Sequence, residues 1–141
     1  MINNKVVYDA DDAAPGELEV YTRNGIKAAI ALCYGASVRR GWWTDIHTQL
    51  PLDRNVPEML CLIHSEISEA MEGYRKNLMD DHLPHRTMFE VELADALIRI
   101  FDLAGGFNLD LASALIEKMA YNAVRKDHAI DARLEKGGKK F

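Results

Sequence analysis

The segment from Val91 to Ala104 constrains the fold more than any other part of the chain, because it is polar along one strip only. Its polar residues follow one another at spacings of three, four and three positions: Glu92, Asp95, Arg99 and Asp102. These are the spacings of one helical face, and nearly every other residue of the segment is Val, Leu, Ile, Phe or Ala. A helix of this kind is buried over most of its circumference. We therefore expect an all-α fold that self-associates, since a chain of 141 residues can hardly wrap such a helix alone.

Apolar residues at helical spacing and capping signals predict four helices, over residues 18–40, 55–76, 87–106 and from Asn108 or Asp110 onward. In the second and third, a capping residue stands three positions before a glutamate. The first contains Gly25 and Gly35, each of which costs on the order of 1 kcal/mol relative to alanine in a helix. We therefore expect that this helix is broken near Gly25, or that close packing explains the glycines.

The length fits a single domain over residues 1–141. Residues 1–16 close with Pro15-Gly16 and are predicted to form an irregular arm. Residues 130–141 are predicted to form a polar tail.

The net charge of -5 argues against a dedicated nucleic-acid surface. Cys33 and Cys61 lie in apolar stretches without metal-ligand spacing, so we expect two reduced core thiols and a cytoplasmic protein. No apolar run approaches the roughly 20 residues that cross a bilayer, and the polar start contains no signal-peptide core. We expect no membrane partner.

Two carboxylate pairs, Glu66 with Glu69 and Glu92 with Asp95, dominate the candidate chemistry. Each pair has the i, i+3 spacing that places both side chains on one helical face, where like charges repel. In the plainest interpretation the acids form the solvated side of their helices. Both pairs adjoin apolar stripes, however, which favours a site for a hard divalent cation such as Mg²⁺ or Mn²⁺.

A di-iron carboxylate protein is a competing interpretation for inward-facing acids on helices. That class requires Glu-x-x-His on two helices, and positions 69 and 95 are Glu and Asp. The absence of histidine at both positions makes iron the poorer choice. His64 could lie at the rim of the site, although a surface position is the simpler expectation.

Two further groups of residues are candidates for substrate binding. Lys118, Asn122 and Arg125 lie at i, i+4 and i+7, which is either the solvated side of the fourth helix or a phosphate-binding strip. Trp42 and Trp43 follow two arginines in a predicted loop. We expect one tryptophan to be a core residue, and the other could stack on a nucleobase.

The ordered combination of these motifs resembles the MazG-like all-α nucleoside triphosphate pyrophosphohydrolases. The similarity spans residues 55–141 and rests on four elements: Leu62-Ile63-His64-Ser65-Glu66-Ile67-Ser68-Glu69-Ala70, Glu92-Leu93-Ala94-Asp95, Lys118-Met119-Ala120-Tyr121-Asn122 with Arg125, and Gly138-Lys139-Lys140-Phe141. Some relatives have Glu-Glu-x-x-Glu as the first motif, and here Ser65 replaces the first glutamate.

The resemblance implies a four-helix bundle that forms a homodimer or, preferentially, a dimer-of-dimers tetramer. It implies hydrolysis of a (deoxy)nucleoside triphosphate between the α and β phosphates, giving the monophosphate and pyrophosphate. Transferred to this chain, the catalytic acids and ligands of Mg²⁺, for which Mn²⁺ can substitute, are Glu66, Glu69, Glu92 and Asp95. The implied phosphate contacts are Lys118, Asn122 and Arg125. We expect Tyr121, Trp42 and Trp43 as further substrate contacts, although the two tryptophans lie outside the segment that carries the resemblance.

The resemblance also favours a deoxynucleotide, with dGTP as the best single choice, because this branch of the family recurs in phages that reshape their host's nucleotide supply. The alternative is a helical oligomer that senses or regulates through nucleotides without cleaving them. Such a protein would be stabilised by triphosphates but would release no pyrophosphate.

Overall fold

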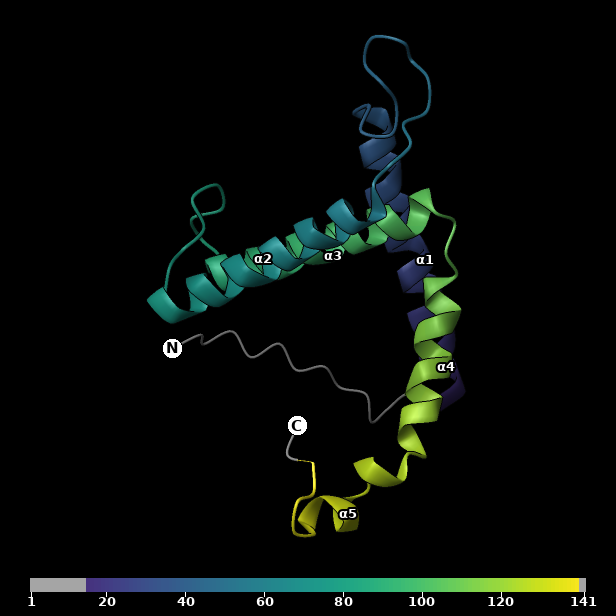
Figure 1. Cartoon of the computed structure of the whole chain (residues 1–141), viewed down its shortest axis with the longest axis vertical. Helices are drawn as coiled ribbons and strands as arrows, with labels where there is room; N and C mark the ends of the chain where they lie inside the picture. Colours follow the sequence, from purple (N-terminus) through teal and green to yellow (C-terminus); the bar gives the residue numbers. More distant parts are fainter. Residues whose placement is uncertain (1–14, 140–141) are drawn as a thin grey trace. The chain divides into compact units, whose positions relative to one another are not determined.

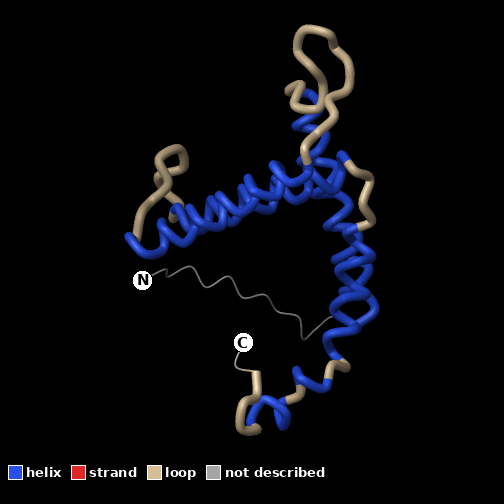
Figure 2. Tube along the Cα trace, viewed as in Figure 1, coloured by secondary structure: helices blue, strands red, loops and turns tan. Residues whose placement is uncertain are grey.

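The computed structural model describes residues 15–139, which form helices and connecting loops and, within that range, no strand (Figures 1 and 2). The elements are α1 Pro15–Arg39, α2 Val56–Lys76, α3 Met88–Gly106, α4 Leu111–Ala123, the short 3-10 helix η1 Lys126–His128, and α5 Ile130–Leu134. The predicted all-α class is confirmed, and each of the four predicted helices is present. No helix in the described range is long and apolar enough to cross a membrane.

The ends of the chain differ in part from expectation. Most of the predicted arm, residues 1–14, lies outside the described residues, as do Lys140 and Phe141. Pro15 and Gly16 belong to α1 and not to an arm, because proline is tolerated at a first helical position, where the missing N–H has no intrahelical partner. Within the predicted tail, Ile130–Leu134 forms α5.

The capping residues that the sequence indicates begin α2, α3 and α4. The side chains of Asn55, Thr87 and Asp110 accept hydrogen bonds from the backbone N–H groups three positions later. Each bond satisfies a donor that the helix itself leaves unpaired. These helix starts are therefore fixed by local chemistry.

Helix α1 runs without a break through Gly25, and close packing does not explain this glycine. A Cβ atom built at Gly25 would have no heavy atom within 4 Å. Both expectations for this position are therefore wrong. A single glycine costs on the order of 1 kcal/mol, which a helix of 25 residues tolerates.

The chain divides into two compact units, Ala28–Leu109 and the remainder, and each is described by itself. In the first, α2 and α3 lie side by side along their length and are joined by the loop 77–87 (Figure 1). Small residues line their contact, with Ala70, Gly73 and Ala96 buried. In the second, Arg23 on α1 donates a 2.5 Å hydrogen bond to Ser113 on α4. The complete four-helix bundle stays a prediction.

Large apolar side chains of α2 and α3 lie outside within one chain, so the burial of α3 over most of its circumference stays a prediction that depends on self-association. Leu97 is 50% exposed and Ile98 48%, while Ile67 and Tyr74 on α2 are 46% and 69% exposed. The residues buried on α3 are Glu92 and two alanines. The contact between the helices thus accepts small residues and carboxylates and leaves the large apolar ones uncovered within one chain.

An aromatic cluster fastens the loop after α1 to the end of α3. The Trp43 ring meets Tyr34 and Phe107 edge-on, with centroids 5.4 Å and 6.0 Å away. Gly105 and Gly106 lie against Tyr34 and Trp43, and a Cβ atom at either position would overlap those rings. These glycines therefore allow close approach, and the residue with positive φ after the helix is Asn108.

The two cysteines are free, as expected, but only Cys33 is partly buried. Cys61 is exposed, so the prediction of a second core thiol is wrong.

Replacing Gly106 with alanine should destabilise the protein by about 1–3 kcal/mol, because the new methyl group forces Trp43 out of place. Gly25→Ala is the matched control, since it adds a methyl group to the same kind of helix in open space and should stabilise by about 0.4–1 kcal/mol. Thermal unfolding followed by circular dichroism measures both. Equal melting temperatures for the two variants would contradict the packing at Gly106.

Candidate functional site

Three of the four predicted acids meet where α2 and α3 face each other. One carboxylate oxygen from each of Glu66, Glu69 and Glu92 lies within 4.8 Å of the others. Asp95, one turn further along α3, is not part of this group. The structure thus brings together acids from both predicted pairs, and we call Glu66, Glu69 and Glu92 the acid cluster.

Two members of the acid cluster are withdrawn from solvent. Glu66 is 7% exposed and Glu92 9%, whereas Glu69 is exposed. Burial raises the pKa of Glu92 from 4.5 to about 7, with further contributions from a hydrogen bond to Glu66 and from the charge of Glu69. Burial also raises the pKa of Asp95, and the charge of Glu66 adds to this rise. Without a cation, the site therefore favours retaining a proton near neutral pH.

Arg99 compensates part of this negative charge. Its Nε atom donates a 2.6 Å hydrogen bond to Oε1 of Glu66. Asp95 lies four positions before Arg99 on the same helix, a spacing at which opposite charges can pair. The bond instead crosses to α2, and Asp95 feels Arg99 only as a charge that lowers its pKa against the larger effect of burial.

The donor atoms of the acid cluster are compatible with a hard divalent cation. Oxygens bound to Mg²⁺ at about 2.1 Å lie at most about 4.2 Å apart, and those bound to Ca²⁺ slightly further. The 4.8 Å spread of the acid cluster is close to these values, so small side-chain rotations would complete the geometry. All three donors are carboxylate oxygens, a set that favours Mg²⁺, Mn²⁺ or Ca²⁺ over zinc.

His64 and Ser65, next to the acid cluster in sequence, point to other roles. The hydroxyl of Ser65 donates a 2.7 Å hydrogen bond to the Leu62 carbonyl of its own helix. His64 is exposed, and its carbonyl accepts a hydrogen bond from Ser68. The Ser65 hydroxyl is therefore used within its own helix.

A cavity of about 620 Å³ lies within the unit Ala28–Leu109 and is connected to the acid cluster through Arg99, which lines the cavity and bonds to Glu66. Asp95 and Arg99 form its wall on the side of the acid cluster. The rest of the wall includes Arg40, Trp42, Arg54 and Asp102, together with apolar residues of α1, α2 and α3. The volume is within the range of small-molecule sites, and the wall combines an aromatic ring with cations. Three arginines against two aspartates leave this wall with a small positive excess, which is compatible with an anionic, ring-containing ligand.

The two tryptophans have different positions, as the sequence predicts. Trp43 is packed in the aromatic cluster, and its Nε1 donates a 2.8 Å hydrogen bond to Oδ1 of Asp102. Trp42 is 63% exposed and lines the cavity. Arg54 donates a 2.5 Å hydrogen bond to the Trp42 carbonyl, and its guanidinium lies 5.5 Å from the centroid of the Trp43 ring. Contact with substrate stays a prediction for both tryptophans, and Trp42 is the accessible one.

Sequence reasoning did not single out Arg40, Arg54 or Asp102 as site residues. Asp102 was visible as the last member of the polar strip of α3, and Arg40 as a neighbour of the tryptophan pair. Arg54 gave no signal, because its contact with Trp42 spans twelve positions of a loop.

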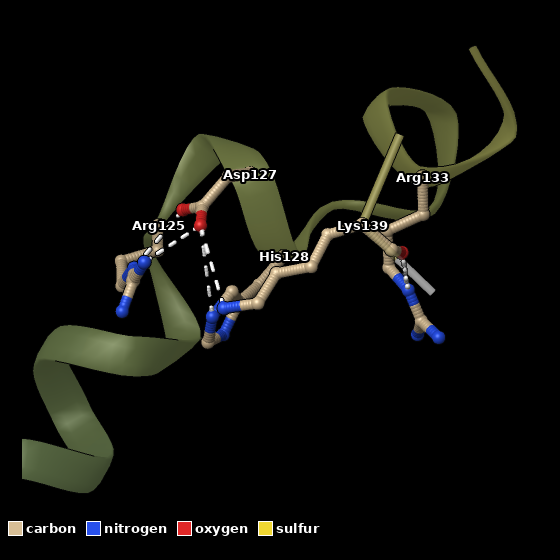
Figure 3. Close-up of polar contacts among 5 residues, drawn as sticks. All are labelled: Arg125, Asp127, His128, Arg133 and Lys139. Carbon is tan, nitrogen blue, oxygen red and sulfur yellow. Dashed lines mark hydrogen bonds and ion pairs between the residues drawn. The ribbon is translucent and has the colours of Figure 1, made fainter. Parts of the chain in front are cut away.

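The predicted phosphate-binding residues lie in the other unit. Helix α4 ends at Ala123, so the predicted helical face cannot extend to Arg125, which lies beyond the helix. Arg125 forms two hydrogen bonds with Asp127, of 2.9 Å and 2.6 Å (Figure 3). His128 and Lys139 approach the same carboxylate at 3.9 Å and 4.0 Å. These two bonds use Nε and one donor of Nη2, so a role for Arg125 in phosphate binding would fall to the remaining donors of its guanidinium.

Lys118, Tyr121 and Asn122 are neighbours on α4. The Lys118 Nζ atom lies 4.6 Å from the centroid of the Tyr121 ring. The Oδ1 atom of Asn122 is buried and has no hydrogen-bond partner among residues 15–139. The convergence of this group with the acid cluster stays a prediction, because the two belong to different units.

No known protein family matches the chain, and no curated protein or solved structure is significantly similar to it. The resemblance to MazG-like enzymes therefore rests on the sequence motifs alone. The acid cluster and the cavity are separate observations from the structure.

The acid cluster makes the stability of the metal-free protein depend on pH. The pKa of Glu92 is higher in the folded protein than in the unfolded chain, so the folded state binds an extra proton between pH 4.5 and about 7. The free energy of unfolding should fall as the pH rises through this window, lowering the melting temperature by several degrees. Thermal unfolding in EDTA at pH 5 and pH 8 measures this change.

The variant Glu92→Gln isolates the contribution of this residue. It should lose most of the pH dependence, and Glu90→Gln, an exposed site on the same helix, should keep it. Millimolar Mg²⁺ at pH 8 should stabilise the wild-type protein and the Glu90 variant but not the Glu92 variant. Equal pH profiles for all three proteins would contradict the buried acid cluster.

Proposed function

We propose that this protein is a Mg²⁺-dependent nucleoside triphosphate pyrophosphohydrolase, which cleaves between the α and β phosphates and releases the monophosphate and pyrophosphate. The observation that supports it best is the acid cluster, which Arg99 connects to a cavity of about 620 Å³ whose wall contains Trp42 and three arginines. This combination offers a cation site next to space for a base and phosphates. The order of the sequence motifs supplies the reaction class.

Each residue of the site has a proposed role that depends on its position. Glu66, Glu69 and Glu92 would hold the cation, with Mn²⁺ able to replace Mg²⁺, and Asp95, which lines the cavity, would complete the ligand set. The bound cation supplies an activated water and offsets the phosphate charge. Arg99 bonds to Glu66 and lines the cavity. When substrate binds, its guanidinium would release Glu66 and donate to a phosphate oxygen instead. Arg40 and Arg54 offer two further cations there.

Base and phosphate contacts from elsewhere in the chain are part of the proposal. Trp42 presents an exposed indole ring to the cavity, and stacking on a base is worth about 1–3 kcal/mol. Trp43 supports it from the aromatic cluster. Lys118, Tyr121, Asn122 and Arg125 would complete phosphate binding if the fourth helix of the same or another chain approaches the cavity. The substrate that we favour is dGTP or another deoxynucleoside triphosphate.

Isosteric removal of single acids tests the reaction. Glu69→Gln and Asp95→Asn should each lower pyrophosphate release at least about a hundredfold, because a cation ligand is lost without a change of shape. Glu72→Gln is the control, since Glu72 pairs with Arg75 and Lys76 on the surface of α2. The eight common nucleoside triphosphates, each with Mg²⁺ and with Mn²⁺, form the substrate panel. Wild-type rates in both acid variants would refute the site.

A non-catalytic nucleotide-sensing oligomer is the alternative that this panel distinguishes. It predicts a higher melting temperature with a triphosphate but no pyrophosphate with any nucleotide or cation.

We further propose that the active form is a homo-oligomer, a dimer or a dimer of dimers. The exposed apolar side chains of α2 and α3, including Ile67, Met71, Leu97 and Ile98, would be covered by a second copy. Leu97→Lys should therefore shift the protein toward monomers and lower its stability. Size-exclusion chromatography with light scattering measures the mass. A wild-type monomer at micromolar concentration would contradict this arrangement.

A further inference from the structure

We infer that the carboxylate of Asp102 binds the base of the nucleotide and selects guanine, through its N1–H and its exocyclic amino group. This inference rests on the proposed function, because it names the base that the same cavity accepts. It begins from a residue of the cavity wall that neither the acid cluster nor the phosphate contacts use.

The position of Asp102 is fixed by the aromatic cluster. Its Oδ1 accepts the 2.8 Å hydrogen bond from Nε1 of Trp43. The Trp43 ring is in turn held between Tyr34 and Phe107 and lies against Gly106. A carboxylate anchored to a packed ring loses little conformational freedom when it binds a ligand.

Asp102 also has unused hydrogen-bonding capacity. A carboxylate accepts about four hydrogen bonds, two at each oxygen. Within residues 15–139, Trp43 is its hydrogen-bond donor, and no cationic side chain forms an ion pair with it within 4.0 Å. One acceptor site on Oδ1 and both on Oδ2 are therefore left for a ligand in the cavity that Asp102 lines.

Guanine is the base whose edge matches two adjacent acceptors. It places the N1–H and N2–H donors side by side, and a carboxylate can accept both in the bidentate manner that it uses with arginine. Adenine and cytosine place a donor beside an acceptor, and thymine and uracil place one donor between two acceptors. With these bases an Asp102 oxygen would face a lone pair.

The distance along α3 fits a nucleotide that extends from Asp102 toward the acid cluster. Asp95 and Asp102 are seven positions apart on one helical strip, which corresponds to about 10 Å along the axis. This is comparable with the length from the edge of a purine to its α phosphate. Trp42 and Arg99 line the same cavity.

The test compares nucleotides that differ only at the edge of the base. The wild-type protein should prefer dGTP over dITP, which lacks the amino group, by at least about tenfold in kcat/KM. Asp102→Asn keeps an oxygen that can accept from Trp43 but replaces an acceptor with a donor. The variant should lose at least about tenfold with dGTP and should gain activity with dXTP, whose O2 accepts a hydrogen bond. Glu90→Gln, an exposed site on α3, should keep the wild-type preferences.

Binding provides a readout that does not depend on cleavage. Calorimetry with the α,β-methylene analogues of dGTP and dITP in Mg²⁺ should show the same preference in the wild-type protein and its loss in Asp102→Asn. Equal affinity of the wild-type protein for the two analogues would overturn the inference, even if Asp102→Asn failed to fold. Pyrophosphate release without discrimination between dGTP and dITP would overturn the role of Asp102 and leave the proposed function intact. Discrimination in binding without pyrophosphate release would support Asp102 and refute the proposed reaction.

Discussion

The meeting of carboxylates between α2 and α3 is the constraint on which the rest of the structure depends. Two helices that approach along small residues such as Ala70 and Ala96 leave little space between them, and this space contains Glu66 and Glu92. Like charges withdrawn from water are costly unless a cation or a proton compensates them. Arg99 provides one cation, and the raised pKa of Glu92 shows that this compensation is incomplete. The contact between the helices is thus suited to a further positive charge.

This arrangement determines where the apolar residues lie. Because acids and alanines occupy the contact between α2 and α3, leucine and isoleucine side chains of both helices face away from it. Burial of such side chains is the main source of folding energy, so a chain that leaves them exposed has not yet used much of its hydrophobic stabilisation. Our proposal of a homo-oligomer follows from these exposed apolar side chains as well as from the sequence motifs. Assembly would supply the stability that the charged contact reduces.

The predictable features are those that depend on neighbours in sequence. The starts of α2, α3 and α4 were predicted because a cap bonds a backbone group three positions away. The i, i+3 acids were predicted for the same reason, since helical geometry fixes the face that they share.

Features that depend on distant partners were not predictable. Arg99 bonds to Glu66 across thirty-three positions, although a closer acid on its own helix was the local choice. Gly105 and Gly106 have the composition of a helix stop, but their role is to admit the rings of Tyr34 and Trp43. Arg125 has the spacing of a helical face that ends before it, because α4 stops at Ala123. In each case a tertiary contact, or the end of a helix, decided between structural interpretations that the spacing of residues in the sequence could not distinguish.

The bond between Trp43 and Asp102 connects the folding of this unit with the chemistry that we propose for it. Trp43 closes the aromatic cluster that fixes the loop after α1 to the end of α3. The same ring orients the carboxylate of Asp102 in the wall of the cavity. Asp102 is the last residue of the polar strip of α3, and the first, Glu92, belongs to the acid cluster. Residues on one rigid helix keep a constant separation. A site that contacts a ligand at both ends of the helix would therefore select ligands by their length as well as by their charge. A helix that is polar along one strip can therefore support both a cation site and a site for the nucleobase.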